Sequence, residues 1–263
     1  MRLKERLVRR QEVSFGAFLG LPSPQLTEML GLSGYDFAIL DTEHGAFGTQ
    51  SMEECLRAGA AVGLPCLVRV KELSAHLIQT ALDLGAEGIQ APRVETADEA
   101  RTAVAFCRFP PQGIRGYGST TRAAAYGFKS RPVVLQEASE KLVIVLQIES
   151  KKGVENLTEI LAVPGVDVVF IGTSDLSLSY GFDRANHPEM TSLVGEIIPR
   201  IRRAGKAAGI FIADWHQIAM LKSLGVNYFT SAGTAVIRSA LEEQVQSFRR
   251  ATDSKVHEAG EQA

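Results

Sequence analysis

The feature that most constrains this chain is a repeated alternation of two kinds of segment. Short apolar runs rich in β-branched and aromatic residues alternate with longer segments whose apolar residues recur at helical spacing. The first kind predicts buried strands and the second predicts amphipathic helices. The eight strand candidates cover residues 13–20, 36–44, 65–70, 88–94, 142–150, 166–175, 207–213 and 227–233. Strands that alternate with helices form parallel sheets, and eight such repeats favour a closed (β/α)8 TIM barrel of the α/β class.

The helical segments support the same fold. They cover residues 24–32, 51–63, 74–86, 98–109, 154–163, 190–205, 216–225 and 234–251. The last one carries an apolar stripe made of Ile237, Leu241, Val245 and Phe248. No G-x-G-x-x-G follows the first strand, which argues against an open dinucleotide-binding sheet. We therefore expect residues 1–263 to form a single barrel domain, with a frayed polar tail from about Asp253.

One segment breaks the alternation. Residues 110–140 are too long for a plain connector between a helix and the next strand. Connections of this length inside a barrel are usually functional. We expect this segment to be either an active-site cover or a contact between subunits.

Composition excludes several classes of function. The formal net charge of −2 and the pI near 6.2 do not indicate binding to nucleic acid or to an anionic membrane. No apolar run is long enough to span a membrane, and the first residues lack the apolar region of a secretory signal. The cysteines Cys55, Cys66 and Cys107 have no metal-site spacing and are expected to be buried in a reducing compartment. We therefore expect a cytoplasmic protein that acts on small molecules.

Polar residues follow the apolar strands at their carboxyl ends. The second strand candidate contains DTEHG at 41–45, the third contains Arg69, the fifth contains QIE at 147–149, and the sixth contains GTSD at 172–175. In a (β/α)8 barrel these ends meet on one rim, where the active sites of such enzymes lie. The sequence therefore predicts the functional site at this rim.

Glu149 and Asp175 are the candidate metal ligands. Two carboxylates from neighbouring strands, completed by water and substrate oxygens, suit Mg²⁺ or Mn²⁺. Zinc is less suited, because neither a thiolate nor a second histidine stands near them in the sequence. The alternative is that each carboxylate only caps a loop. Gln147 is two residues before Glu149 on a strand, so both side chains point to the same side.

His44 is the candidate base, because a histidine can titrate near neutral pH. The alternative is a structural histidine. Asp83 would orient His44, although its position fits an ordinary acid at a helix end equally well. Arg69 ends an otherwise apolar strand and needs an anionic partner. That partner is either a substrate carboxylate or enolate, or a structural ion pair with Glu43 or Asp41.

The lysines bear on how the site could stabilise an enolate. An enzyme that activates a carbonyl substrate as a Schiff base requires a desolvated lysine in its pocket. No strand candidate carries a lysine in its interior, since Lys71 follows the third strand and Lys206 precedes the seventh. This pattern favours enolate stabilisation by a metal ion over an imine.

Several of these motifs together resemble the HpcH/HpaI family of metal-dependent 4-hydroxy-2-oxo acid aldolases. They are DTEHG at 41–45, Arg69, LDLGAEGIQAPRV at 82–94, PPQGIRGYG at 110–118, QIES at 147–150 and FIGTSDLS at 170–177. They occur in the same order over nearly the whole chain. The resemblance implies a barrel of the pyruvate/phosphoenolpyruvate superfamily that assembles as a hexamer, a trimer of dimers, in which partners exchange the last helix.

The resemblance also implies roles for individual residues. Glu149 and Asp175 would hold a divalent metal ion, with the choice among Mg²⁺, Mn²⁺ and Co²⁺ left open. His44 would be the base, Asp83 the partner that raises its basicity, and Arg69 the group that stabilises the enolate. Substrate contacts would come from Gln147, Ser174, Asp175 and Arg69. The chain departs from its relatives at Lys71, where a proline is usual, and around Gly233-Thr234, where an acid is common. Both departures bear on the preferred substrate.

The expected reaction is reversible retro-aldol cleavage of a 4-hydroxy-2-oxo acid to pyruvate and an aldehyde through a metal-bound pyruvate enolate. Such acids include 4-hydroxy-2-oxoheptane-1,7-dioate and 2-keto-3-deoxy sugar acids. One alternative is an acyl-CoA ester lyase of the citrate lyase beta or malyl-CoA type, which the modest charge does not favour. Another is a non-catalytic barrel that binds an oxo acid, which retention of the candidate catalytic groups argues against.

Overall fold

The computed structural model describes the backbone of residues 2–260 and the side chains of residues 2–252. The chain divides into two compact units, Met1–Ser231 and Ala232–Ala263. The first unit contains nearly the whole barrel, and the second consists almost entirely of one helix. The expectation of a single domain over residues 1–263 stays a prediction.

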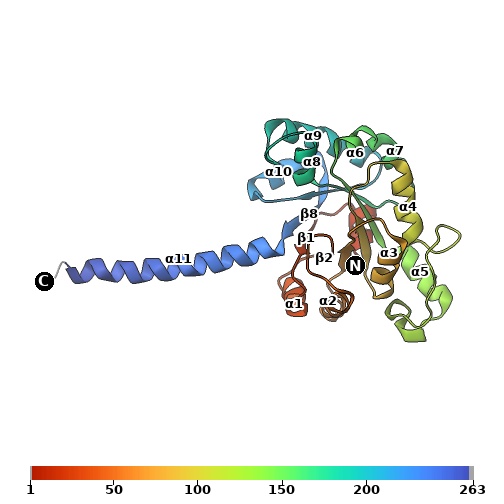
Figure 1. Ribbon diagram of the computed structural model, residues 1–263, viewed down its shortest axis with the longest axis horizontal. Helices are drawn as coiled ribbons and strands as arrows, with labels where there is room; N and C mark the ends of the chain where they lie inside the picture. Colours follow the sequence, from red (N-terminus) through yellow and green to blue (C-terminus); the bar gives the residue numbers. More distant parts are fainter. Residues whose placement is uncertain (1, 261–263) are drawn as a thin grey trace. The chain divides into compact units, whose positions relative to one another are not determined.

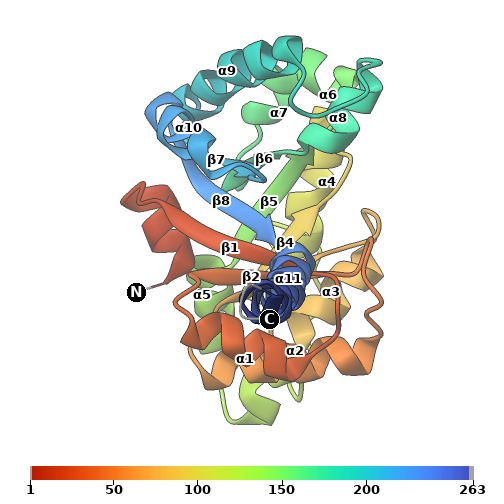
Figure 2. The same cartoon turned by 90° about the vertical axis from the view of Figure 1, so that its left-hand side faces the viewer.

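The first unit is built around a closed barrel of parallel strands (Figures 1 and 2). The strands are β1 (Ser14–Leu19), β2 (Phe37–Asp41), β3 (Cys66–Arg69), β4 (Gly88–Ala91), β5 (Val143–Ile148), β6 (Val168–Ile171), β7 (Ala207–Phe211) and β8 (Val226–Ala232). Each strand from β1 to β7 pairs in parallel with the next one along the chain. Each strand overlaps one of the apolar runs singled out above. The prediction of a (β/α)8 barrel is confirmed.

Helices fill the connections between strands. They are α1 (Pro24–Leu32), α2 (Thr49–Ala61), α3 (Ala75–Asp83), α4 (Ala97–Cys107), α5 (Arg131–Lys141), α6 (Lys151–Glu155), α7 (Leu157–Leu161), α8 (Thr173–Ser179), α9 (Pro188–Arg203), α10 (Ile218–Leu224) and α11 (Gly233–Gly260). Short helical turns are η1 (Glu5–Arg9), η2 (Arg122–Gly127) and η3 (Trp215–Gln217). Several helices begin at a side-chain cap: the Ser23 hydroxyl accepts from Leu26 N at 3.1 Å, and Thr96 and Glu99 form a capping box.

The barrel has two apolar layers because strand residues alternate between its two faces. The inner layer includes Ile39, Val145 and Phe170, and the larger outer layer packs the strands against the helices. Leu3 and Leu7, from the segment around η1, pack with the inner layer. Since Asn227, near the start of β8, donates to Leu7 O at 2.9 Å, η1 lies at the amino-terminal end of the barrel. The opposite, carboxyl-terminal rim holds the polar groups described below.

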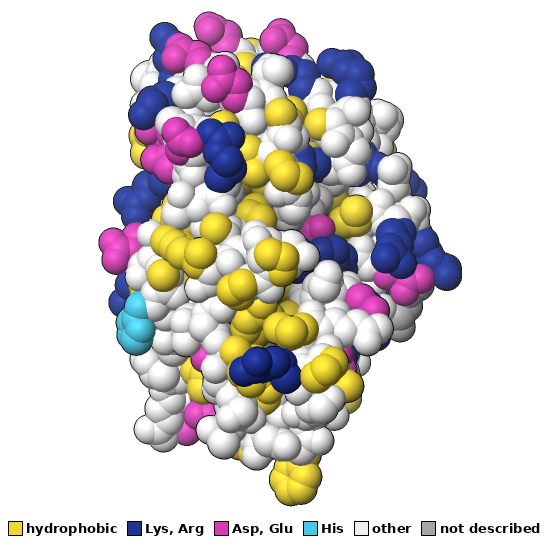
Figure 3. All heavy atoms as spheres, turned by 90° about the vertical axis from the view of Figure 1, so that its right-hand side faces the viewer, with side chains coloured by type: hydrophobic (Ala, Val, Ile, Leu, Met, Phe, Trp, Pro, Cys, Tyr) yellow, Lys and Arg dark blue, Asp and Glu magenta, His cyan; other side chains and the backbone are white. Residues whose placement is uncertain are grey.

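The segment between α4 and β5 contains two elements that the sequence did not predict, η2 and α5. Its exposed apolar side chains include Ile114, Tyr126, Phe128 and Val133. Figure 3 shows groups of apolar side chains on one face of the molecule, with Lys and Arg side chains among them. Exposed apolar surface on this segment is consistent with the expectation of a subunit contact.

The helix α11 carries the stripe predicted from the sequence; Ile237 is half-buried, and the other three side chains are exposed. Leu241 is 58% exposed, Val245 49% and Phe248 69%. The prediction for the polar tail from about Asp253 concerns side chains that lie outside the described residues. In the described part of the chain, no helix is both long enough and apolar enough to cross a membrane.

The three cysteines are free and buried, as predicted. Burial raises the pKa of the Cys66 thiol to about 12 and that of the Cys107 thiol to about 12. A thiol with such a pKa stays protonated at neutral pH, so these residues act as small apolar side chains rather than nucleophiles or metal ligands.

Candidate active site at the carboxyl rim of the barrel

The turn after β2 is organised by Asp41, the last residue of that strand. Its Oδ1 accepts from the backbone N–H groups of Glu43 at 3.1 Å and His44 at 3.2 Å. A Cβ at Gly45 would lie 2.2 Å from Asp41 O, so only glycine lets the chain turn this closely. The carboxylate of Asp41 therefore fixes the backbone from which the His44 side chain starts.

The buried guanidinium of Arg69, at the end of β3, forms a two-point ion pair with Asp41. Its Nε donates to Asp41 Oδ1 at 2.9 Å, and its Nη2 donates to Asp41 Oδ2 at 2.6 Å. The guanidinium lies over the Phe18 ring, 4.7 Å from its centroid, and Nη1 is 3.4 Å from Glu43 Oε2. The structural ion pair considered from the sequence therefore exists. The pair also fixes the orientation of a cation at the rim, which is what stabilising a substrate anion requires.

Glu149 is a buried carboxylate just beyond the end of β5. Its Oε1 accepts from the backbone N–H of Arg93 at 2.8 Å, and its Oε2 accepts from the amide of Gln147. A Cβ at Gly172 would lie 2.6 Å from Oε2, so glycine is needed where β6 ends beside it. Burial raises the pKa of Glu149, and the negative charges of Asp175 and Glu43 raise it further.

The arrangement of acidic groups fits a divalent cation. Asp175 lies in the first turn of α8, is exposed, and is close enough to Glu149 to influence its pKa. The Oε2 atom of Glu43 is buried and has no hydrogen-bond partner among the described residues. A cation would offset the repulsion among these three carboxylates. Among the described residues, no three histidine, cysteine or acidic side chains form a metal-binding group. Two carboxylates completed by water and substrate oxygens suit Mg²⁺ better than zinc.

His44 and Asp83 are not joined by a hydrogen bond among the described residues. The His44 side chain is exposed. Asp83, the last residue of α3, accepts from Arg115 Nη2 at 3.0 Å instead. The Arg115 guanidinium in turn lies over the Phe109 ring, 4.5 Å from its centroid. The pairing of His44 with Asp83 stays a prediction, whereas Asp41 holds the His44 backbone directly.

The two lysines next to strands lie at opposite ends of the barrel. Lys71 follows β3 at the carboxyl-terminal rim, and its side chain is exposed to solvent. Lys206 is buried, and its Nζ donates to Val163 O at 3.0 Å and to Val166 O at 3.2 Å. These carbonyls precede β6, and Lys206 precedes β7, so the ammonium group lies at the amino-terminal end of the barrel. Neither lysine therefore offers a desolvated amine at the carboxyl rim, which an imine with the substrate requires.

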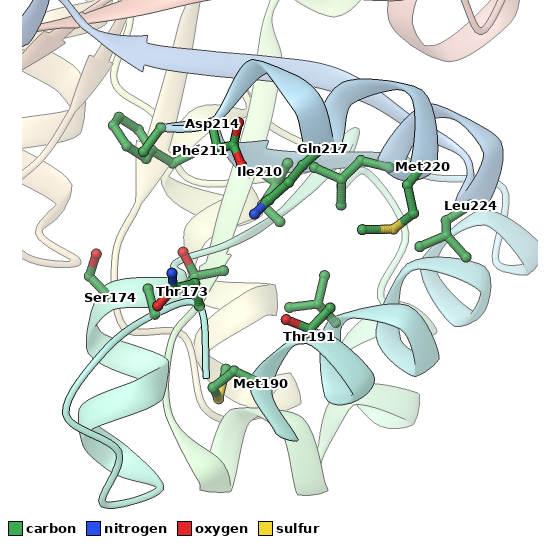
Figure 4. A pocket seen from close by; sticks show the side chains of 15 residues that line it. Thr173, Ser174, Met190, Thr191, Ile210, Phe211, Asp214, Gln217, Met220 and Leu224 are labelled. Atoms are coloured by element: carbon green, nitrogen blue, oxygen red, sulfur yellow. The ribbon is translucent and has the colours of Figure 1, made fainter. Parts of the chain in front are cut away.

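A cavity of about 290 Å³ adjoins the rim at Thr173 and Ser174 (Figure 4). Met190 of α9, Ile210 of β7 and Leu221 of α10 line it, and all three belong to the outer apolar layer. The cavity therefore lies between α9 and α10, outside the barrel interior. Since Glu149 and Arg69 line other parts of the rim, this cavity is not where their chemistry takes place.

Two groups that hold Glu149 were not predicted from the sequence. The backbone N–H of Arg93 contacts Glu149 directly, and the side chain of Gln90 contacts it through Gln147. Gln90 is a buried polar residue inside the short strand β4, and a polar residue at such a position is a signal that could have been used. Arg93 donates through its backbone, which has a φ of 52°. An arginine at a positive φ cannot be recognised from the residue type, so the sequence did not indicate this contact.

Comparison with known proteins identifies the family. Residues 14–226 match the HpcH/HpaI aldolase/citrate lyase family. The chain is 37% identical over 249 residues to a 2-keto-3-deoxy-L-rhamnonate aldolase of Escherichia coli, which covers 94% of this chain and 92% of that protein. An HpcH/HpaI aldolase/citrate lyase family protein from Burkholderia cenocepacia has a TM-score of 0.88 at 34% identity, covering 94% and 98% of the two chains. An HpcH/HpaI aldolase from Desulfitobacterium hafniense has a TM-score of 0.89 at 28% identity, covering 95% and 97%.

The fold and these relatives define a barrel enzyme of the carbon–carbon lyase class, an aldolase. The chain belongs to the HpcH/HpaI aldolase/citrate lyase family. This family is generally dependent on a divalent metal ion.

Proposed function

We propose that this aldolase cleaves a 4-hydroxy-2-oxo acid, of the 2-keto-3-deoxy sugar acid class, to pyruvate and a short hydroxyaldehyde, and that it also catalyses the reverse reaction. The observation that carries the proposal is the convergence of Arg69 and the carboxylates of Glu43, Glu149 and Asp175 on one rim of the barrel. The likeness to a 2-keto-3-deoxy-L-rhamnonate aldolase supports the substrate class. The setting we propose for this reaction is the cytoplasm.

In this proposal Glu149 and Asp175 hold the divalent cation, with Mg²⁺ or Mn²⁺ as the first candidates and Co²⁺ as the third. When bound, such a cation acts as a Lewis acid towards the carboxylate and keto oxygens of the 2-oxo acid. Gln147 keeps one amide hydrogen free for the substrate, since its oxygen accepts from Gln90 and its other hydrogen is donated to Glu149. Ser174 precedes Asp175 and offers an exposed hydroxyl to the same substrate.

Two side chains act during the proposed cleavage: one accepts a proton, and the other stabilises the negative charge that develops. His44 takes the proton from the C4 hydroxyl group, and the C3–C4 bond then breaks to release the aldehyde. The electron pair of that bond passes into the pyruvate part, where it forms an enolate. Arg69, held by Asp41, stabilises the negative charge on the enolate oxygen. Asp83 is proposed to support His44.

The proposed reaction is tested in the synthetic direction. A six-carbon 2-keto-3-deoxy acid that lacks the terminal hydroxyl splits between C3 and C4 into pyruvate and lactaldehyde. With Mn²⁺ supplied, we expect the protein to condense pyruvate with lactaldehyde and to form a 4-hydroxy-2-oxo acid, measured by NMR. Malyl-CoA is the comparison substrate, and no cleavage of it to acetyl-CoA and glyoxylate is expected. Absence of condensation with every short hydroxyaldehyde, together with formation of acetyl-CoA and glyoxylate from malyl-CoA, would contradict the proposal and favour an acyl-CoA lyase.

We further propose that the chain forms a homo-oligomer larger than a dimer, namely a hexamer built as a trimer of dimers. The exposed apolar stripe of α11 supports a subunit contact, because large apolar side chains at such spacing are stable when another surface covers them. The exposed apolar side chains between α4 and β5 offer a second surface.

The assembly is tested by two truncations with light scattering at micromolar concentration. Removal of residues 234–263 deletes the stripe and is expected to abolish the soluble oligomer. Removal of residues 253–263 keeps the stripe and is the matched control, which we expect to assemble normally. A full-length chain that is a monodisperse monomer would contradict the proposed assembly.

A further inference from the structure

A chain of hydrogen bonds crosses the barrel interior and ends on Glu149. The hydroxyl of Tyr228, on β8, lies 3.5 Å from Gln90 Oε1, on β4. Gln90 Nε2 donates to Gln147 Oε1, on β5, at 2.7 Å, and Gln147 Nε2 donates to Glu149 Oε2. All four side chains are buried. Three strands thus contribute to the position of one carboxylate.

The direction of every hydrogen bond in this chain follows from the carboxylate at its end. An ionised carboxylate only accepts, so Gln147 must turn its NH₂ group towards Glu149 and its oxygen away. The oxygen of Gln147 then needs a donor, and among the described residues the NH₂ group of Gln90 supplies it. Gln90 consequently presents its own oxygen to the Tyr228 hydroxyl. Neither Gln90 nor Gln147 can reverse its side-chain amide without placing two acceptors, or two donors, opposite each other.

Tyr228 is the first donor of this hydrogen-bond series, at the end farthest from Glu149, and its surroundings suit that role. Its ring stacks on Phe37 with centroids 4.4 Å apart, and the residue is completely buried. A Cβ at Gly209 would lie 2.9 Å from its ring, so the neighbouring strand also closes around it. Burial raises the pKa of Tyr228 well above its usual value, which keeps the hydroxyl protonated and able to donate.

We propose that Gln90, fixed by Tyr228, is a positioning residue that acts through Gln147 to orient Glu149 for a divalent cation. With Arg93 N on Oε1 and Gln147 on Oε2, both oxygens of Glu149 are held. Each oxygen still has a lone pair free to face the cation. Gln90 touches neither substrate nor cation in this proposal, which rests on the metal site of the proposed function.

Such outer partners commonly change metal affinity about 10–100-fold when removed. Gln90→Met keeps the volume and the apolar packing but removes the donor, so the amide of Gln147 can reverse. Gln90→Glu keeps the shape but, when ionised, offers only acceptors. Gln147 would then turn its NH₂ group towards position 90 and its oxygen towards Glu149, which repels the carboxylate. We therefore expect the glutamate variant to bind metal no better than the methionine variant.

The test measures binding of Mn²⁺ alone, without substrate, by electron paramagnetic resonance of the free ion. Gln90→Met and Gln147→Met are each expected to weaken binding roughly tenfold or more. The double variant is expected to bind no more weakly than Gln147→Met, because Gln90 acts only through Gln147. A purely structural role would make the two effects additive. Gln136→Met is the matched control, since it removes a glutamine–glutamate bond on the surface of α5, and it should leave Mn²⁺ affinity unchanged.

A second variant guards against misfolding of the methionine variants. Tyr228→Phe keeps the stacked ring and removes only the hydroxyl. It is expected to weaken Mn²⁺ binding by about threefold, the effect of one ordinary hydrogen bond and less than the effect of losing Gln90 itself. Additive effects in the double variant would overturn the proposal. Unchanged affinity in the Gln90 variants would overturn it as well, while the metal site itself would stand. If the wild-type protein bound no Mn²⁺ at all, the proposed function would be overturned together with it.

Discussion

Replacement of Glu149 or Asp175 by alanine is expected to lower aldol cleavage by on the order of 10³-fold, with no rescue at ordinary metal concentrations. A metal ion acting as a Lewis acid contributes several kcal/mol to stabilisation of the transition state. Since each ~1.4 kcal/mol changes a rate tenfold, loss of a ligand has a large effect. Exhaustive chelation of the wild-type protein should abolish activity, and Mg²⁺ or Mn²⁺ should restore it.

The matched controls for these variants are Glu159→Ala and Asp183→Ala, which remove exposed acids elsewhere. Both should retain wild-type activity and metal dependence. Pyruvate turnover in the presence of borohydride separates the two mechanisms. A reduced lysine adduct with pyruvate, or full activity after exhaustive chelation, would show that the chain uses an imine and not a cation.

The barrel could be predicted because its strands are buried on both faces. Such strands appear as continuous apolar runs, and every predicted run overlaps an observed strand. The helix α5 was missed for the complementary reason. Its only buried side chain is Val134, so its residues 131–141 carry no apolar stripe.

The candidate site could be predicted only in part. Strand-end position indicated Arg69 and Glu149, and both lie on the rim as expected. Spacing along the chain left the partner of Arg69 open between Glu43 and Asp41. In the structure Arg69 pairs with both, and the two-point contact goes to Asp41 because the register between β2 and β3 places Asp41 directly beside Arg69. The partner of Asp83 is Arg115, which lies in the long segment whose course periodicity does not define.

The roles of His44 and Arg69 are separated by their effects on different steps. His44→Ala is expected to slow carbon–carbon cleavage by roughly 10²–10⁴, the range for a positioned acid–base group, and to leave metal and pyruvate affinity intact. Loss of Arg69 is expected to suppress cleavage and proton exchange at the pyruvate methyl group together, by about 10²–10³. Both reactions pass through the enolate that this residue stabilises.

The choice of Arg69 variants matters because of its partner. Arg69→Ala would leave the buried Asp41 carboxylate unpaired, which costs about 3–5 kcal/mol of stability in such pairs. Arg69→Lys keeps the charge and is therefore the better-folded variant, to be checked by thermal unfolding. A lysine cannot reproduce the two-point contact with Asp41, so we expect it to restore little activity.

The most direct test of enolate formation at this rim is exchange of solvent deuterium into the pyruvate methyl group, followed by NMR with Mg²⁺ present and no aldehyde added. The wild-type protein and His44→Ala should exchange the methyl protons, provided that His44 serves only the C4 hydroxyl proton. Arg69→Lys and Arg69→Ala should exchange about 10²–10³ times more slowly. Rapid exchange in Arg69→Ala alongside abolished cleavage would contradict this account, because it would place the arginine at the aldehyde rather than at the enolate.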